Sequence, residues 1–234
     1  MLFILALLII IGLAALPGIW VRTVMARHSA DRPDFPGTGA EFARYLLEGM
    51  KLGDVKVDVI YKGNHYSPAE LVIRLDPTNY DGRSLTAIVV AAHEVGHAMQ
   101  HATEFRPLLT CALTRAIAHI VERVGLAFAI ALAPILVIVM HHASGALIAL
   151  IIALLVMSTT FVADLAALPV EFDASFNRAL PILKEGRFIP ESDLPAARSI
   201  LRAAAFTYVA GSVIGIFNIL RWLRILLGAA PSSG

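Results

Sequence analysis

The chain has 234 residues, of which 58% are hydrophobic and only 16% charged, and its mean hydropathy is +0.74. Apolar residues make up roughly 45–50% of an ordinary soluble domain, so this composition predicts a membrane protein. The formal net charge of +1 excludes an electrostatic argument for a nucleic-acid partner. A single cysteine excludes an intramolecular disulfide and a cysteine-rich zinc cluster, so a bound metal would need histidine and carboxylate ligands.

Charge-free apolar stretches predict about four transmembrane helices. Residues 1–21 are expected to form an N-terminal anchor, because the positive charges follow the apolar run. Residues 124–163 are long enough for two spans and predict a transmembrane helical hairpin that turns at 141–144. Residues 203–227 are expected to form a C-terminal span that ends near interfacial arginines. These stretches predict a multi-pass protein in contact with the lipid bilayer.

Two more polar segments lie between the predicted spans. Residues 22–123 carry 12 of the 19 Lys and Arg residues, and residues 164–202 carry 5. The positive-inside rule therefore predicts that both segments are cytoplasmic. Only Arg221 and Arg224 would lie on the other side.

The segment 22–123 shows local patterns of helix and strand. Helical spacing of apolar residues predicts a helix over 40–53, and alternation predicts strands over 55–61 and 70–76 with a turn-bearing connection between them. Ser84 is a typical N-cap for a helix that runs through residues 85–104. The second strand directly precedes this helix, so it is a candidate to pair with an extended substrate.

The helix after Ser84 carries the HExxH motif. His93 and His97 are four residues apart, so both imidazoles lie on one helix face and can bind one metal ion. Glu94 lies beside them as the candidate general base toward a metal-activated water. Small apolar residues before the motif predict a buried helix, and Gly96 predicts an open surface beside the metal. The motif therefore predicts one zinc ion per chain.

The third protein ligand has to come from outside the motif. His101 lies a full helical turn beyond His97, too far along the axis to share the same ion easily, which favours a supporting or surface position. Glu171 and Asp173 follow Pro169, a residue typical of a helix start, where acidic side chains also suit the helix dipole. Because the HExxH motif lacks a partner, Glu171 is the leading candidate for the third ligand.

The stretches "NHYSP", "VIRL", "DGRSLTAIVVAAHEVGHAMQHA" and "LPVEFDAS" closely resemble the bacterial neutral zinc metallopeptidases of the YugP-like membrane family. The resemblance covers nearly the whole chain. It implies zinc on His93 and His97, a catalytic Glu94, and Glu171 as the third ligand in the manner of gluzincins. That family is distantly similar to the HtpX and CAAX prenyl protease group, whose motif places an aspartate four residues after the glutamate. Here that position is Ser175, so Asp173 and Asp164 are the remaining candidates to orient a zinc histidine.

The sequence thus predicts a mainly α membrane protein with a small α+β, zincin-like catalytic domain. The predicted function is a membrane-anchored zinc endopeptidase of the bacterial inner membrane that hydrolyses protein or peptide substrates, with oligomers left open. Two alternatives stay open: an intramembrane-cleaving site-2-type protease and a non-catalytic zinc-binding membrane scaffold. Candidates to stabilise the oxyanion, or to support the zinc ligands from outside, are His65, Tyr66, Asp173 and Arg178.

Overall fold

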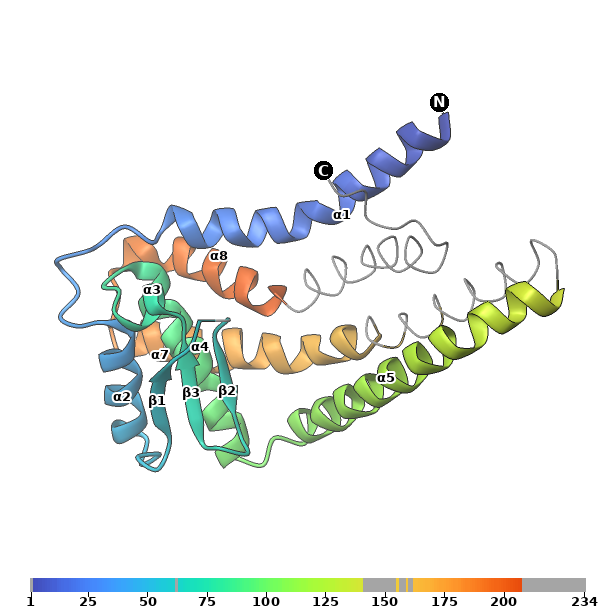
Figure 1. Cartoon of the computed structure of the whole chain (residues 1–234). Helices are drawn as coiled ribbons and strands as arrows, with labels where there is room; N and C mark the ends of the chain where they lie inside the picture. Colours follow the sequence, from blue (N-terminus) through green and yellow to red (C-terminus); the bar gives the residue numbers. More distant parts are fainter. Residues whose placement is uncertain (1, 62, 141–154, 156–158, 160–161, 208–234) are drawn as a thin grey trace. The chain divides into compact units, whose positions relative to one another are not determined.

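The computed structural model describes residues 2–61, 63–140, 155, 159 and 162–207 (Figure 1). The described residues divide into two compact units. One unit, here called the HExxH unit, consists of residues 19–109 and 168–207. The other contains residues 2–18 and the described residues of 110–167.

The HExxH unit is mainly α-helical and contains a three-stranded sheet. In chain order it contains the end of α1 (Leu2–Arg27), α2 (Gly39–Gly49), β1 (Lys56–Val59), β2 (His65–Ser67), β3 (Val72–Leu75), α3 (Pro77–Tyr80), α4 (Leu85–Ala102), the π-helix η1 (Asp173–Ala179), α7 (Leu180–Glu185), the 3-10 helix η2 (Glu191–Asp193) and α8 (Leu194–Ala205). α5 (Arg106–Met140) begins in this unit and continues in the other. A helical segment over residues 162–172 leads directly into η1.

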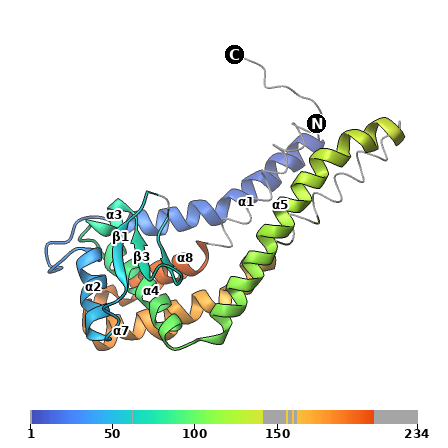
Figure 2. The same cartoon turned by 60° about the horizontal axis from the view of Figure 1, so that its bottom comes forward.

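α4 forms the centre of the HExxH unit, as its run of small apolar residues predicts. The Ser84 side chain accepts a hydrogen bond from the Ala87 backbone at 3.1 Å and caps the helix, which confirms the predicted start. Every residue from Leu85 to Gly96 is buried. Figures 1 and 2 show α4 enclosed by α2, α8, the sheet and the segment around η1, all of which contact it. The HExxH motif therefore lies on a helix that is packed on several sides.

The sheet has the strand order β1-β3-β2, with β1 parallel and β2 antiparallel to β3. The predicted strands over 55–61 and 70–76 are confirmed as β1 and β3. β2 was missed, because it occupies only three residues of a connection that reads as a turn in the sequence. β3 is hydrogen-bonded on both sides, so the prediction that it pairs with an extended substrate is wrong. The outer edges of the sheet belong to β1 and β2.

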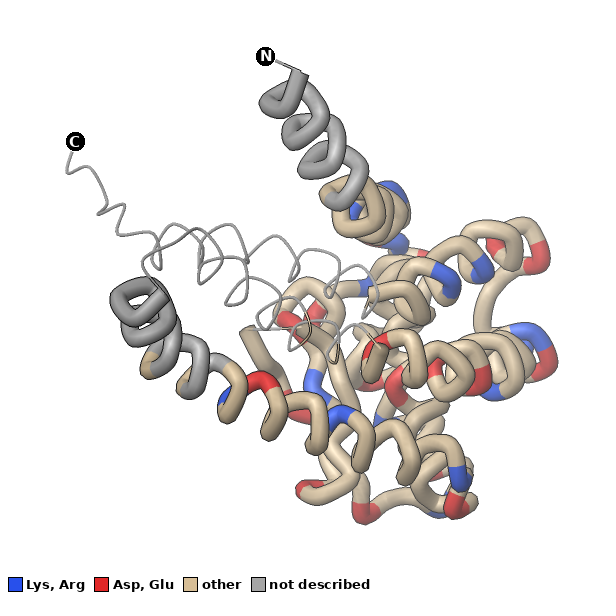
Figure 3. The backbone as a smooth tube through the Cα atoms, turned by 90° about the vertical axis from the view of Figure 1, so that its right-hand side faces the viewer, with Lys and Arg blue, Asp and Glu red and all other residues tan. Residues whose placement is uncertain are grey.

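Charged residues of both signs are interspersed along the backbone of the HExxH unit (Figure 3). The Arg32 guanidinium lies 2.6 Å from the neighbouring Asp34 and 2.9 Å from Asp193, which is far away in the sequence. Both of these carboxylates, and the charge attraction that they exert, raise the pKa of Arg32. Arg32 thereby links the loop before α2 to the start of α8.

The prediction of about four transmembrane helices is wrong for the residues that the structure describes: none of their helices is long and apolar enough to cross a membrane. α1 contributes its residues from Ile19 onward to the HExxH unit, where Val24 is buried, and this leaves only residues 2–18 outside. In α5 the described charge-free part, residues 124–140, is shorter than the roughly 20 residues that a crossing takes. The other predicted spans, 141–163 and 203–227, lie largely outside the described residues.

Candidate metal centre

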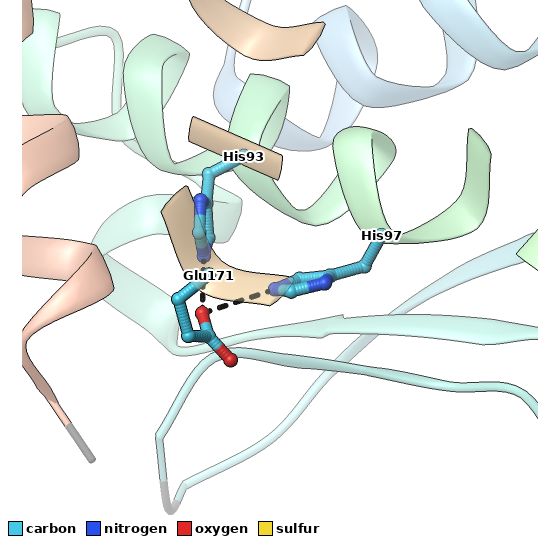
Figure 4. Close-up of side chains that lie close together, drawn as sticks. All are labelled: His93, His97 and Glu171. Atoms are coloured by element: carbon cyan, nitrogen blue, oxygen red, sulfur yellow. Dashed lines mark ion pairs between the residues drawn. The ribbon is translucent and has the colours of Figure 1, made fainter. Parts of the chain in front are cut away.

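His93 and His97 lie one turn apart on α4, and their rings face the same space. The ring centroids are 4.7 Å apart and the ring planes are nearly perpendicular, at 81°. His93 is buried and the His97 side chain is 11% exposed. This edge-to-face arrangement directs the Nε2 atom of each imidazole away from the helix toward a third side chain (Figure 4).

That third side chain is Glu171, which the sequence favoured as the missing partner. Its Oε2 atom lies 3.3 Å from the Nε2 atom of His93 and 3.3 Å from that of His97 (Figure 4). One ligand atom from each of the three residues falls within 4.8 Å of the others. Glu171 Oε2 is buried and has no hydrogen-bond partner within the described residues. Two imidazoles and one carboxylate thus converge on a single point.

Glu171 reaches this point from a helix that the sequence did not predict correctly. Pro169 was expected to start a helix, but the helical segment 162–172 runs through it, and Glu171 lies near its end. Attraction to a helix N-terminus therefore does not explain the acidic side chain. Its position next to η1 brings it against the motif-bearing face of α4.

The electrostatics of the three side chains fit a cation site. Burial by itself would raise the pKa of Glu171, but the charges of His97 and His93 outweigh it and hold this pKa well below its usual range. Burial lowers the pKa of His97, whereas the attraction of Glu171 raises it, for a net value of about 9. Two neutral imidazoles with one carboxylate form a known ligand set of catalytic zinc. The orphaned Oε2 atom and this donor set both fit a zinc ion.

Glu94 lies beside the three converging side chains and is not one of them. It is 5% exposed, and burial raises the pKa of its carboxyl group, while the charges of His93 and His97 oppose that rise. A carboxylate with a raised pKa is a stronger proton acceptor than an exposed one. Glu94 therefore has the environment that a general base requires.

Two buried side chains contact the Nδ1 atoms on the far side of the imidazoles. Ser175 Oγ lies 3.0 Å from Nδ1 of His93, and Gln100 Oε1 lies 2.9 Å from Nδ1 of His97. Both side chains are fully buried. The sequence analysis noted Ser175 only as a departure from an aspartate, and it missed Gln100, although Gln100 follows His97 by three residues and so shares its helix face.

Asp173 and Arg178 form a pair behind Gln100. Gln100 Nε2 donates to Asp173 Oδ2 at 2.9 Å, and Arg178 Nε donates to the same oxygen at 2.7 Å. Burial acts to raise the pKa of Asp173, but these donors and Asn177 outweigh it and lower the pKa. Arg178 also lies over the Phe105 ring at 5.5 Å. The guanidinium is thus engaged by Asp173 and Phe105, which argues against a role at the oxyanion.

The other predicted candidates lie on β2 or outside the HExxH unit. Tyr66 Oη lies 2.8 Å from Nδ1 of His101, so this pair connects β2 to the end of α4. His65 starts β2, and its charge is one of the influences that oppose the rise in the pKa of Glu94. Asp164 belongs to the other compact unit, where it lies 3.9 Å from Arg115.

Gly96 was predicted to leave an open surface, but that space is filled by the backbone of η1. A Cβ atom at Gly96 would lie 2.7 Å from the Ala174 carbonyl oxygen, a distance shorter than any ordinary contact. The glycine therefore lets α4 and η1 approach each other closely. Glu171 and Ser175, three residues before and one residue after Ala174, depend on this approach for their positions.

His93, His97 and Glu171 together form a candidate zinc site. The sequence profile of the family described as "Putative neutral zinc metallopeptidase" matches residues 2–227, and the chain belongs to this family. The chain is also 35% identical, over 230 residues that cover 97% of each protein, to "Putative membrane protease YugP" of Bacillus subtilis (strain 168). No solved structure shows a significant match to the chain. The resemblance read from the sequence is confirmed.

Proposed function

We propose that the protein is a zinc-dependent endopeptidase whose metal is held by His93, His97 and Glu171. The observation that carries this proposal is the convergence of both Nε2 atoms on one buried, otherwise unpartnered carboxylate oxygen at 3.3 Å. A buried carboxylate is costly unless a cation lies beside it, and a metal ion held by all three side chains supplies that charge when both imidazoles are neutral. Membership of the zinc metallopeptidase family supports the identity of the cation and the type of bond that is cleaved.

In the proposed reaction Glu94 moves the proton. A zinc ion in such a site supplies Lewis acidity, which lowers the pKa of a water ligand to about 7 and polarises the substrate carbonyl. Glu94 accepts the proton of the attacking water as the oxygen bonds to the carbonyl carbon. It then donates this proton to the amide nitrogen as the carbon–nitrogen bond breaks, so that a carboxylic acid and an amine leave. Burial of Glu94 supports both steps, because it raises the pKa of the carboxyl group and so makes the carboxylate a stronger proton acceptor.

An extended peptide is the substrate shape that the sheet favours. Within the described residues β2 pairs only with β3, so its outer edge offers backbone hydrogen bonds to a further strand. Tyr66 on this strand contacts His101 of α4 at 2.8 Å, and the charge of His65 acts to lower the pKa of Glu94. We assign substrate binding to this edge, and His65 is our first candidate to stabilise the oxyanion, because Arg178 is held by Asp173.

The site of action that we propose is a bacterial membrane. The support is the printed name of the relative, a membrane protease, together with the 58% hydrophobic composition of the chain. An intramembrane-cleaving mechanism is not favoured, since α4 is enclosed by α2, α8, η1 and the sheet. We therefore place peptide hydrolysis in the HExxH unit.

Metal analysis and a cleavage assay test the proposal together. We expect about one zinc per purified chain, and we expect His93→Ala, His97→Ala and Glu171→Ala each to lose it. His119→Ala, which removes a 67% exposed histidine of α5, is the matched control and should keep it. Glu94→Gln should keep zinc but lose cleavage of a quenched fluorescent peptide library, because an amide cannot take a proton from water.

Each outcome has a distinct meaning. Full zinc content in the three ligand variants would overturn the metal site. Zinc in the wild-type chain without any peptide cleavage would favour the non-catalytic scaffold. Equal cleavage by wild type and Glu94→Gln would remove Glu94 from the mechanism and leave the metal site standing.

A further inference from the structure

The Ser175 hydroxyl has a hydrogen-bonding arrangement that fixes the tautomer of His93. Its single hydrogen donates to the Leu201 carbonyl of α8 at 3.2 Å. When the hydrogen is donated to Leu201, the oxygen lone pairs face His93 Nδ1 at 3.0 Å, which favours a proton on this nitrogen. In the neutral form of the ring, Nε2 of His93 is then unprotonated and has its lone pair on the side of Glu171.

The Gln100 amide imposes the same tautomer on His97. Its Nε2 group donates to the Val170 carbonyl at 2.8 Å and to Asp173 at 2.9 Å, and both partners can only accept. This leaves Gln100 Oε1, an acceptor, opposite His97 Nδ1 at 2.9 Å. A flipped amide would face these two acceptors with its oxygen and lose both hydrogen bonds. The orientation of the amide is therefore set by its surroundings.

The π-helix η1 supplies the outer part of this chain of hydrogen bonds. Its wider turn brings residues five apart onto the same side, and Arg178 thereby reaches Asp173, five residues earlier, at 2.7 Å. Asn177 donates to the other carboxylate oxygen at 3.0 Å. Asp173 is held by these donors and presents one oxygen to Gln100. The continuous path therefore runs from Arg178 through Asp173 and Gln100 to His97.

We propose that Ser175 and the Gln100–Asp173–Arg178 chain are positioning residues that lock both imidazoles as Nδ1–H tautomers with their Nε2 atoms toward the metal. This inference rests on the proposed zinc site, and it assigns to uncharged buried groups the orienting role that a carboxylate often fills. None of these four residues touches the metal position itself. Their effect on zinc is transmitted through the two histidines.

Zinc affinity, measured by competition with a chromogenic chelator, is the first test. Gln100→Met and Ser175→Ala keep the approximate volume of each side chain but remove the acceptor, and each should weaken zinc binding by about ten- to a hundredfold. The matched control is Thr86→Val, because Thr86 is also buried on α4 but donates to the Met25 carbonyl, about two helical turns before His93. An equal loss in Thr86→Val would show a general effect on packing and overturn the proposal.

A double-mutant cycle tests the order of the chain. Arg178→Met should weaken zinc binding less than Gln100→Met, because it acts through two intervening contacts, and Arg178→Lys should restore part of the loss. In a Gln100→Met background, Arg178→Met should have no further effect on zinc affinity, since the path to His97 seen among the described residues runs through Gln100. Additive losses in the double variant would overturn the proposed chain.

Nuclear magnetic resonance supplies a readout that a purely structural role would not change. In zinc-loaded protein with ¹⁵N-labelled histidine, the Hδ1 protons of His93 and His97 should both exchange slowly with water. Gln100→Met should abolish slow exchange at His97 alone, and Ser175→Ala at His93 alone, so each histidine is the control for the other. Unchanged Hδ1 signals would refute the positioning roles, whereas a wild-type chain that binds no zinc would instead refute the proposed function.

Discussion

Gly96→Ala tests how closely the metal centre depends on helix packing. The added Cβ atom would lie 2.7 Å from the Ala174 carbonyl oxygen, whereas ordinary contact begins at 3.4 Å, so η1 has to move by about 0.7 Å. The same segment carries Glu171 and Ser175, and a site of this kind tolerates displacements of only about 0.5 Å. We expect zinc affinity to fall by about ten- to a hundredfold, which is the usual effect of changing the groups that hold metal ligands in place.

The effect of this substitution on stability combines two opposing contributions. Alanine is favoured over glycine inside a helix by about 1 kcal/mol, while overpacking a filled core costs about 1–3 kcal/mol. Because the contact at Gly96 involves backbone and not a flexible side chain, we expect the overpacking to dominate and the melting temperature to fall.

Gly49→Ala is the matched control for Gly96→Ala. Gly49 is also helical, at the end of α2, but a Cβ atom there meets nothing within 4 Å. This variant should bind zinc normally and melt at the same or a higher temperature. The assays are chelator competition and thermal unfolding. A Gly96→Ala protein that binds zinc as tightly as the wild type would refute the link between the close approach and the metal centre.

Three further predictions address the proton balance, the helix cap and the substrate edge. Because the pKa of His97 without metal is about 9, zinc binding at pH 7 should release about one proton and weaken as the pH falls; identical calorimetric heats in buffers of different ionisation enthalpy would contradict this. Ser84→Ala removes the cap of α4 and should lower the free energy of unfolding, measured by chemical denaturation, by about 1 kcal/mol. An unchanged free energy of unfolding would show that the cap does not stabilise the protein. Tyr66→Phe should keep zinc but alter kcat/KM for peptides, and unchanged kinetics would argue against substrate binding beside β2.

The sequence was most informative where the determining interactions are local. The helical spacing of His93 and His97 and the cap at Ser84 depend on residues only a few positions apart, so the motif-bearing helix was predicted with its correct start. Glu171 was found by a different argument, namely that the motif required an acidic partner. Its approach to α4 over a long sequence separation is confirmed by geometry, although its helix does not start at Pro169.

The features that the sequence missed depend on tertiary contacts. β2 has only three residues, and it exists because β3 offers a partner strand. The π-helical turn of η1 has no simple periodicity in the sequence, and the closeness of η1 to Gly96 depends on two segments far apart in the chain. Counting apolar residues likewise predicted spans without accounting for the part of α1 that packs into the HExxH unit.

The groups that orient the two histidines show how charge is distributed around the centre. The partners in direct contact with the imidazoles, Ser175 and Gln100, are fully buried and uncharged. The charged pair of Asp173 and Arg178 lies further out, where each side chain is 15% exposed. A carboxylate at position 175 would add a third buried acid next to Glu171 and Glu94, and each buried charge costs several kcal/mol unless it is compensated. In the proposed site the uncharged side chains Ser175 and Gln100 thus orient the imidazoles. The negative charge that balances the zinc ion comes from Glu171.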